Sequence, residues 1–297
     1  MQAIILENKR IGNSSLLKTQ RDKYYKMRFS CDGFSSASPG QFVMIRVNNS
    51  YDPFLRRPMS IYRIDKKKKI VEILYQVVGK GTNIMSELKK GDEIDVLGPL
   101  GRGFWIPEEI ENVFIIAGGI GIAPMIALSE KLRITNYELR ITVFIGGKTK
   151  NDILYKEDFK KIGAKVYIAT EDGSIGKKGT CVDIFKKWTT NLQSSIFNLQ
   201  SSIIFACGPQ GMLKAVASIA KDKNMACQVS LDKRMACGTG ACLGCVVRVS
   251  GQWSVVSGQK NKKDDASTLN TQHSTLYKCV CTDGPVFDAE EINWESI

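Results

Sequence analysis

Three cysteines lie close together in the segment MACGTGACLGC. Cys237, Cys242 and Cys245 have the spacing C-x4-C-x2-C, which is typical of plant-type [2Fe–2S] ferredoxins and requires a fourth cysteine further downstream. The intervening glycines allow the backbone to approach a cluster and to direct amide groups at its sulfurs. The alternatives are a structural zinc site and reduced structural thiols; zinc sites usually pair their ligands as C-x2-C twice and match this segment less well. The segment therefore predicts an iron–sulfur cluster, which accepts one electron at a time.

The fourth ligand is expected in KCVCTDGPVF, which contains Cys279 and Cys281. Residues two apart on an extended chain point to the same side, so spacing alone leaves both cysteines open. Thirty-five residues lie between Cys245 and Cys281, and many of them are polar. We expect an exposed insert near 257–275. It contains the only histidine, His273, which is expected to be a surface residue and not a catalyst.

Two glycine-containing turns each follow a strand-like apolar run and predict a nucleotide site. VFIIAGGIGIAPMIAL has the order strand, glycine turn and helix, and the amides of a helix N-terminus favour a phosphate group. FACGPQGML repeats the arrangement, and ligands of open α/β sheets gather at the carboxyl ends of strands. The G-x-G-x-x-G pattern is absent, so a plain turn is an equal alternative for the first segment alone, and Cys207 also fits a buried core cysteine. The candidate residues are Gly118, Gly119, Gly121, Cys207, Gly208 and Pro209.

Charged residues mark two further candidate contacts with a nucleotide. In TEDGS, Glu171 and Asp172 end a third strand-like run, where they would bind a ribose hydroxyl and repel a 2′-phosphate; a plain turn fits nearly as well. In LRRPMS, Arg57 stands immediately before an extended Pro-Met-Ser, and GKGT precedes a helix-like segment. An arginine together with a Gly-Thr helix start would hold a pyrophosphate.

Three regions that differ in composition and in the pattern of apolar residues must position these residues. Residues 1–104 contain short β-type runs punctuated by Gly and Pro, which predict a small antiparallel barrel. From 105 to 225, strand-like runs alternate with helix-length segments, which predicts a parallel sheet with helices on both faces. Residues 226–297 hold the cysteines and the polar insert. NLQSSIF at 191–197 is followed directly by NLQSSII at 198–204, a local duplication whose first copy is expected to loop out before a strand.

Composition is that of a soluble globular protein, with 43% hydrophobic and 24% charged residues. The net charge is +12, but the lysines are scattered, and the one run, 66–69, is interpreted as a solvated hairpin turn. The apolar run at the N-terminus is too short for a signal peptide, and no apolar stretch is long enough to span a membrane. The nine cysteines are better explained by metal ligation in a reducing compartment than by disulfides. We therefore expect a cytoplasmic protein that binds neither nucleic acid nor membrane.

The chain resembles the ferredoxin–NADP reductase superfamily in the order of four motifs, RPMS, GKGT, AGGIGIAPM and ACGP. In that superfamily a barrel holds FAD and an α/β domain holds NAD(P). SLDKRMACGTGACLGC and CVCTDGPVF narrow the resemblance to the electron-transfer subunits of NAD-dependent dihydroorotate dehydrogenases. The implied FAD residues are Arg57, Pro58, Met59, Ser60, Leu74, Tyr75, Gln76, Gly81 and Thr82. The implied NAD residues are Gly118, Gly119, Ile120, Gly121, Ala123, Cys207, Gly208 and Pro209, with Asp172 as the ribose candidate. The implied cluster ligands are Cys237, Cys242, Cys245 and Cys281, since the family's fourth ligand directly precedes a TDGP-like run.

The resemblance also implies an organisation and a function. The expected domains are a FAD-binding barrel (1–104), an NAD-binding α/β domain (105–225) and a small [2Fe–2S] domain (226–297). The chain would be an oxidoreductase subunit of pyrimidine biosynthesis. Electrons would pass from an FMN-containing, dihydroorotate-oxidising catalytic subunit through the cluster and FAD to NAD⁺, in a heterotetramer of two of each subunit. No residue of this chain is expected to catalyse dihydroorotate oxidation itself.

Two alternatives remain, one a related enzyme and the other a protein of a different functional class. One is the small flavin subunit of an NADH-dependent ferredoxin–NADP oxidoreductase or sulfide dehydrogenase, where an aspartate commonly replaces the first cluster cysteine; this chain has Cys237. The other is a cofactor-less regulatory or binding module on a reductase scaffold, which would be colourless. The four retained cysteines and both phosphate-type turns argue against it.

Overall fold

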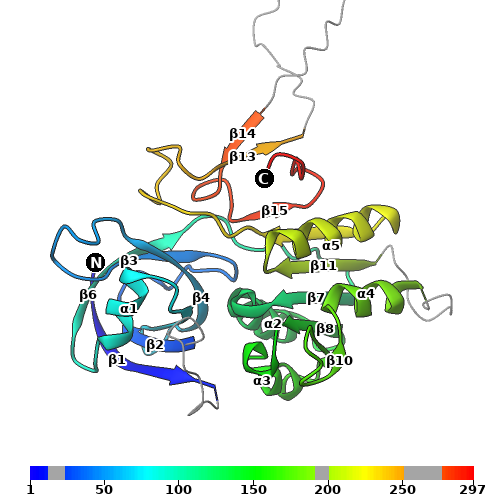
Figure 1. Cartoon of the computed structure of the whole chain (residues 1–297), viewed down its shortest axis with the longest axis horizontal. Helices are drawn as coiled ribbons and strands as arrows, with labels where there is room; N and C mark the ends of the chain where they lie inside the picture. The colour runs from blue at the N-terminus through cyan, green and yellow to red at the C-terminus, as the bar shows by residue number, and fades with distance from the viewer. Residues whose placement is uncertain (13–23, 191–200, 251–275) are drawn as a thin grey trace, which may run out of the picture.

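The computed structural model describes residues 1–12, 24–190, 201–250 and 276–297. They form a closed β-barrel, a seven-stranded sheet covered by helices, and a smaller C-terminal part that lies above both in Figure 1. This arrangement confirms the predicted fold class. The insert near 257–275, with His273, lies outside the described residues, and so does the duplicated segment up to residue 200.

The N-terminal barrel closes six antiparallel strands in the order β1-β2-β5-β4-β3-β6. Buried side chains such as Met27, Phe29, Val43 and Ile45 fill it. The lysine run 66–69 is exposed in the turn between β4 and β5, as its interpretation as a solvated hairpin turn predicted. The elements of the barrel are β1 (Gln2–Ile11), β2 (Tyr24–Ser30), β3 (Phe42–Arg46), β4 (Arg57–Asp65), β5 (Ile70–Gln76), α1 (Lys80–Glu87) and β6 (Glu93–Leu100).

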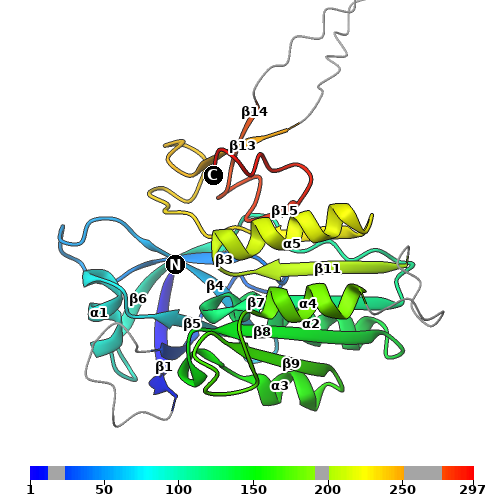
Figure 2. The same cartoon turned by 45° about the vertical axis from the view of Figure 1, so that its right-hand side comes forward.

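The sheet has the strand order β10-β9-β8-β7-β11-β12-β15 and is parallel except at β15; β11, β7, β8 and β9 follow one another in Figure 2. Strand β7 is buried along its whole length because helices cover both faces. Phe114 and Ile116 pack with α4 and α5, whereas Val113 and Ile115 pack with α2 and α3. The elements are β7 (Asn112–Gly118), η2 (Gly119–Gly121), α2 (Ile122–Thr135), β8 (Arg140–Gly147), η3 (Lys150–Asp152), α3 (Lys156–Lys161), β9 (Lys165–Thr170), β10 (Lys177–Lys178), α4 (Cys181–Thr190), β11 (Ser202–Cys207), α5 (Gln210–Asp222), β12 (Ala226–Ser230) and β15 (Val286–Asp288).

The chain order of this sheet reverses between β7 and β11. From β7 the chain moves outward to β8 and β9, and it later returns to place β11 on the other side of β7. The carboxyl ends of the two strands therefore lie side by side, with Cys207 paired to Ala117. Open α/β sheets bind their ligands at such a reversal point. Both glycine-containing turns begin there.

The C-terminal part contains a two-stranded antiparallel sheet of β13 (Val246–Val249) and β14 (Leu276–Cys279). Cys245 and Cys281 share a buried cluster with Met44 of the barrel and Val229 of the sheet, so this part rests on both others. The domain boundaries at 104 and 225 remain predictions; strands β12 and β15, both beyond residue 225, extend the nucleotide sheet. Among the described helices, none combines the length and apolar character needed to cross a bilayer.

Candidate functional site

One large cavity, with a volume of 1360 Å³, opens where the barrel, the sheet and the start of the C-terminal part meet. Pockets for single small ligands usually measure roughly 300–1,000 Å³, so this cavity has room for more than one nucleotide. The residues expected at the flavin all line it: Arg57, Pro58, Met59, Ser60, Leu74, Tyr75, Gln76, Gly81 and Thr82. The residues expected at NAD line it too, with the exception of Asp172: Gly118, Gly119, Ile120, Gly121, Ala123, Cys207, Gly208 and Pro209.

The barrel side of the cavity is formed by the start of β4 and the first turn of α1. A Cβ at Gly81 would overlap the Arg57 Nε atom, so the glycine leaves the space that the guanidinium occupies. The Thr82 hydroxyl accepts hydrogen bonds from the backbone amides of Val78 (2.9 Å) and Gly79 (3.2 Å) and shapes the turn before α1. An arginine beside the start of a helix is an arrangement that can bind a pyrophosphate.

The sheet side of the cavity is formed by the two glycine-containing turns, which touch each other. A Cβ at Gly121 would overlap the carbonyl oxygen of Cys207, and one at Gly118 would lie 2.8 Å from both Met212 Sδ and Pro209 Cδ. Gly119 has a φ of +54°, which favours glycine. Turns that are distant in the sequence therefore form one bare backbone surface, suited to close approach by a ligand.

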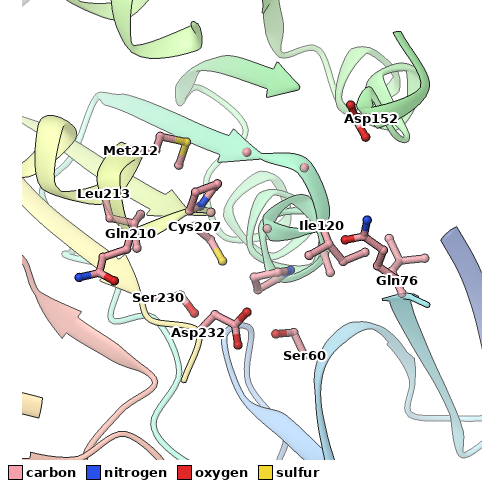
Figure 3. A pocket seen from close by; sticks show the side chains of 18 of the residues that line it. Ser60, Gln76, Ile120, Asp152, Cys207, Gln210, Met212, Leu213, Ser230 and Asp232 are labelled. Carbon is pink, nitrogen blue, oxygen red and sulfur yellow. The ribbon is translucent and has the colours of Figure 1, made fainter. Parts of the chain in front are cut away.

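Four polar or sulfur-containing side chains gather at the centre of the cavity. Figure 3 shows the Cys207 sulfur directed toward Ser230 and Asp232, with Ser60 facing them from the barrel. Burial raises the pKa of Cys207 to about 12, which makes it a poor nucleophile. Burial also raises the pKa of Asp232. Ser230 and Asp232 were not predicted from the sequence; their place at the carboxyl end of strand β12 is the signal that points to them.

The ribose candidates in TEDGS separate in the structure. Glu171 lines the cavity and Asp172 does not. The Asp172 Oδ1 atom instead accepts hydrogen bonds from the backbone amide (2.9 Å) and hydroxyl (2.7 Å) of Ser174. These bonds lower the pKa of Asp172 and stabilise the turn. The geometry therefore favours Glu171 over Asp172 as a group that meets a nucleotide.

The cysteine loop directs backbone amides at its own sulfurs. The Cys237 Sγ atom accepts hydrogen bonds from the amides of Thr239 and Cys242, both at 3.4 Å, and these bonds lower the pKa of Cys237 to about 6. Gly238 and Gly240 have φ values of +76° and +82°, which non-glycine residues rarely adopt. The loop thus has the amide-rich curvature that stabilises the negative charge of an iron–sulfur cluster.

Cys281 joins this loop through two hydrogen bonds. Its Sγ atom accepts from the amide of Gly240 at 3.2 Å, and its own amide donates to Cys245 Sγ at 3.4 Å. Cys279 ends strand β14, and its amide donates to Asp283 Oδ2 at 2.7 Å. Within the described part of the chain, no three His, Cys, Asp or Glu side chains are grouped tightly enough for one metal ion; a [2Fe–2S] cluster needs only two cysteines at each iron. The cysteines present fit such a cluster.

Comparison with known proteins defines the class first. Residues 115–218 match the family model described as the oxidoreductase NAD-binding domain, and 232–262 with 267–293 match the iron–sulfur cluster binding domain of dihydroorotate dehydrogenase B. A solved NADH-dependent reduced ferredoxin–NADP oxidoreductase is similar with a TM-score of 0.76 and 28% identity, over 98% of this chain and 90% of that one. A ferredoxin NADP⁺ reductase from Neisseria gonorrhoeae shares the fold, with a TM-score of 0.60, 15% identity, and coverage of 75% and 91%. The chain is an oxidoreductase component with a ferredoxin-reductase fold and an iron–sulfur domain.

Relatives with known names identify the family. The dihydroorotate dehydrogenase B (NAD(+)) electron transfer subunit of Desulforamulus reducens is 36% identical over 275 residues, which are 91% of this chain and 93% of the relative. The subunit of the same name from Caldanaerobacter subterraneus is 35% identical over 292 residues, 98% of each chain. The chain belongs to the family of dihydroorotate dehydrogenase B (NAD(+)) electron transfer subunits. The family resemblance drawn from its motifs is thereby confirmed.

Proposed function

We propose that this chain passes electrons from a dihydroorotate-oxidising partner subunit to NAD⁺ in pyrimidine biosynthesis. The names of its relatives support the proposal. The observation that carries it is the cavity shared by the flavin-type strand β4 and the carboxyl ends of β7 and β11, with the cysteine loop packed on the same barrel. When bound, a [2Fe–2S] cluster supplies one-electron transfer, FAD links one- and two-electron transfer, and NAD⁺ accepts a hydride.

On this proposal the barrel residues of the cavity hold FAD. Arg57 binds its phosphates, and Gly81 and Thr82 hold the pyrophosphate at the start of α1. Ser60 faces the flavin ring. The remaining contacts, with the flavin, ribityl or adenosine portions, are assigned to Pro58, Met59, Leu74, Tyr75 and Gln76. Support comes from the position of every one of these residues in the wall of the cavity.

The opposite wall is assigned to NAD. The two glycine-containing turns bind its phosphates and nicotinamide portion through Gly118, Gly119, Ile120, Gly121, Ala123, Cys207, Gly208 and Pro209. Glu171 replaces Asp172 as the proposed acceptor for a ribose hydroxyl, because only Glu171 lines the cavity. A carboxylate there accepts a hydrogen bond from a 2′-hydroxyl and repels a 2′-phosphate.

The cluster is assigned to Cys237, Cys242, Cys245 and Cys281. The amide contacts that join Cys281 to Gly240 and Cys245 support its choice over Cys279. The chain's part in electron transfer is therefore to hold the cluster on strand β3, beside the strand that lines the cavity.

The partner is proposed to be an FMN-containing dihydroorotate dehydrogenase catalytic subunit. The words "electron transfer subunit" in the names of the relatives support a partner that performs the substrate oxidation. Assembly as a heterotetramer of two of each subunit and a cytoplasmic location stay predictions from the sequence.

The test is coupled activity. The chain would be produced anaerobically with the dihydroorotate-oxidising subunit of the same genome, and NAD⁺ reduction would be followed after addition of dihydroorotate. We expect activity only when both chains are present. Cys237→Ser should abolish it, whereas Cys31→Ser, at a buried position in the barrel core, should not. A coloured protein that oxidises NADH with ferricyanide but never couples to dihydroorotate would contradict the named function.

A second candidate is the small subunit of an NADH-dependent reduced ferredoxin–NADP oxidoreductase, favoured by the similarity to that solved structure. It predicts reduction of ferredoxin or NADP⁺ in place of dihydroorotate-dependent NAD⁺ reduction. Measuring both the reduction of ferredoxin or NADP⁺ and the dihydroorotate-dependent reduction of NAD⁺ with the same preparation separates the two functions. A colourless protein would instead indicate the cofactor-less module.

A further inference from the structure

The barrel and the α/β part are joined on one side by polar contacts, most of them between residues that do not line the cavity. Arg63 of β4 donates from Nε to Glu130 Oε1 (2.7 Å) and from Nη2 to Asp158 Oδ2 (3.0 Å). Glu130 lies on α2 and Asp158 on α3. One barrel arginine therefore holds two helices of the α/β part at once, through charged hydrogen bonds in a fixed fork.

Two tyrosines of the barrel extend these contacts. The Tyr62 hydroxyl donates to Asp158 Oδ2 at 2.9 Å, and Arg63 Nη1 donates to the same hydroxyl at 3.0 Å. In the wall of the cavity itself, the Tyr24 hydroxyl donates to Asp152 Oδ1 at 2.9 Å. We call these six residues the clasp: Tyr24, Tyr62 and Arg63 on the barrel, and Glu130, Asp152 and Asp158 on the α/β part.

The surroundings of the clasp make it more than a surface ion pair, a kind of contact that usually contributes little. Tyr62 is fully buried, and the side chain of Asp158 is 15% exposed. Tyr62 also belongs to the buried cluster that contains Ile122 and Leu128 of α2. Because Asp158 stands at the edge of a shared apolar core, loss of Arg63 removes a charged hydrogen bond that water replaces only poorly there. Asp158 would keep the Tyr62 hydroxyl and Lys161 as partners, and Glu130 is 34% exposed.

The clasp joins the two elements that carry the proposed cofactor sites. Strand β4 begins with the flavin residues Arg57 to Ser60 and continues directly into Tyr62 and Arg63. Helix α2 begins at the glycine turn 119–121 and carries Glu130 further along. The clasp therefore ties the helix that follows the glycine turn to the strand that begins with the flavin residues.

We propose that Arg63 is a positioning residue for hydride transfer: with Tyr62, Glu130 and Asp158 it holds the dinucleotide turn at a fixed separation from the flavin strand. The inference rests on the proposed function. Hydride transfer requires reacting atoms about 3–3.5 Å apart, and a misplacement of about 1 Å costs on the order of 100-fold in rate. Residues outside the cavity thereby control the reaction without touching either nucleotide.

The variant Arg63→Gln tests this in the full-length flavoprotein, with Arg140→Gln as the matched control. Arg140 also bonds two side chains, Glu111 and Asn112, but both lie within the α/β part. Three quantities are measured: the rate of flavin reduction at saturating NADH by stopped flow, the Kd of ADP-ribose, and backbone hydrogen exchange in β4 and α2.

We expect Arg63→Gln to slow flavin reduction by on the order of 10- to 100-fold, with the Kd of ADP-ribose changed less than about twofold. Exchange in β4 and the start of α2 should accelerate. Arg63→Lys, which keeps the charge but not the fork, should lie in between; Arg140→Gln should change none of the three. A rate loss matched by an equal loss of ADP-ribose binding would reveal general damage and overturn the positioning role.

Flavin reduction by NADH in the unaltered protein separates this inference from the proposed function. If NADH fails to reduce the flavin of the unaltered protein, the proposed function is wrong, and a role of the clasp in hydride transfer falls with it. If NADH reduces the flavin, and Arg63→Gln leaves both rate and exchange unchanged, the NADH-dependent part of the proposed function stands and the clasp alone is rejected.

Discussion

Gly238 of the cysteine loop lies directly against Met44 of strand β3, where a Cβ on the glycine would come within 2.7 Å of the methionine Cγ atom. Met44 pairs with Pro58 of β4, which lines the cavity. The missing Cβ permits this approach, and glycine also tolerates the φ of +76° at this position. The loop of the proposed cluster therefore rests on the strand next to the one that lines the proposed flavin site.

Replacing Gly238 with alanine is expected to disturb the loop and release the cluster. The positive φ alone costs about 1 kcal/mol or more for a residue with a Cβ, and the overlap with Met44 adds to it. Gly244→Ala is the control, since its Cβ meets only Cys242 Sγ at 3.5 Å, an ordinary contact. The measurements are the iron and acid-labile sulfide content per chain and the melting temperature of the two variants. Equal iron content in the two variants would contradict the prediction.

The choice of fourth ligand predicts different outcomes for two cysteines that are nearly adjacent. Cys281→Ser should lose most of the visible absorption of the cluster, because its sulfur is the one that faces the Gly240 amide. Cys279→Ser should keep it, with some loss of stability, because this side chain packs in the buried core. Absorption and electron paramagnetic resonance of the reduced protein measure both. If Cys281→Ser keeps the signal of the cluster, the fourth ligand must be assigned to Cys279 instead.

Alanine at Gly81 should weaken FAD binding through Arg57. The new Cβ overlaps the Arg57 Nε atom, and overpacking of this kind typically costs about 1–3 kcal/mol, which corresponds to roughly 5- to 150-fold in affinity. Gly79→Ala is the neighbouring control, because nothing lies within 4 Å of its Cβ. The flavin content of purified protein and the Kd on reconstitution are the measurements. If Gly81→Ala and Gly79→Ala bind FAD equally well, the assigned role of the turn is wrong.

Discrimination between NADH and NADPH should depend on Glu171. Removing its charge in Glu171→Gln weakens a charged hydrogen bond to the ribose and relieves repulsion of a 2′-phosphate, so the ratio of kcat/KM for NADH over NADPH should fall by about 10-fold. Asp172→Asn should leave that ratio unchanged, because this carboxylate is bonded to Ser174. Steady-state rates with ferricyanide as acceptor provide both numbers. A ratio that changes only in Asp172→Asn would reverse the assignment.

Replacing Asp232 with asparagine is expected to change the stability of the protein in a way that depends on pH. Desolvation raises its pKa in the folded protein, so its contribution to stability is present below the unfolded pKa and is lost as the pH rises through the folded pKa. Asp232→Asn should therefore raise the urea midpoint at neutral pH and leave it unchanged below about pH 3.9. Hydrogen bonds from Ser174 lower the pKa of Asp172 in the folded protein. Asp172→Asn should therefore lower the urea midpoint at neutral pH. A lower neutral midpoint for Asp232→Asn would contradict the prediction.

The local sequence was sufficient to predict an architecture of three parts. The alternation of short apolar runs in 1–104 and of strand- and helix-length segments in 105–225 reflects side-chain periodicity, which is a property of neighbouring residues. The family and its functional class followed from short motifs, because turns that bind phosphate or a cluster need glycine and cysteine at close, fixed spacing. The limits of the sheet were harder to predict, since β15 joins it from beyond the cysteine loop.

Contacts between distant segments were decided only by the tertiary structure. Cys279 and Cys281 are equivalent by spacing, and only the fold brings the Gly240 amide to one of them. Glu171 and Asp172 are equivalent by charge, and the turn bonded to Ser174 directs one away from the cavity. Arg63 belongs to no motif, and its contacts with Glu130 and Asp158 form only because β4, α2 and α3 meet. Sequence alone determined which chemical groups are present, whereas packing decided which of them face one another.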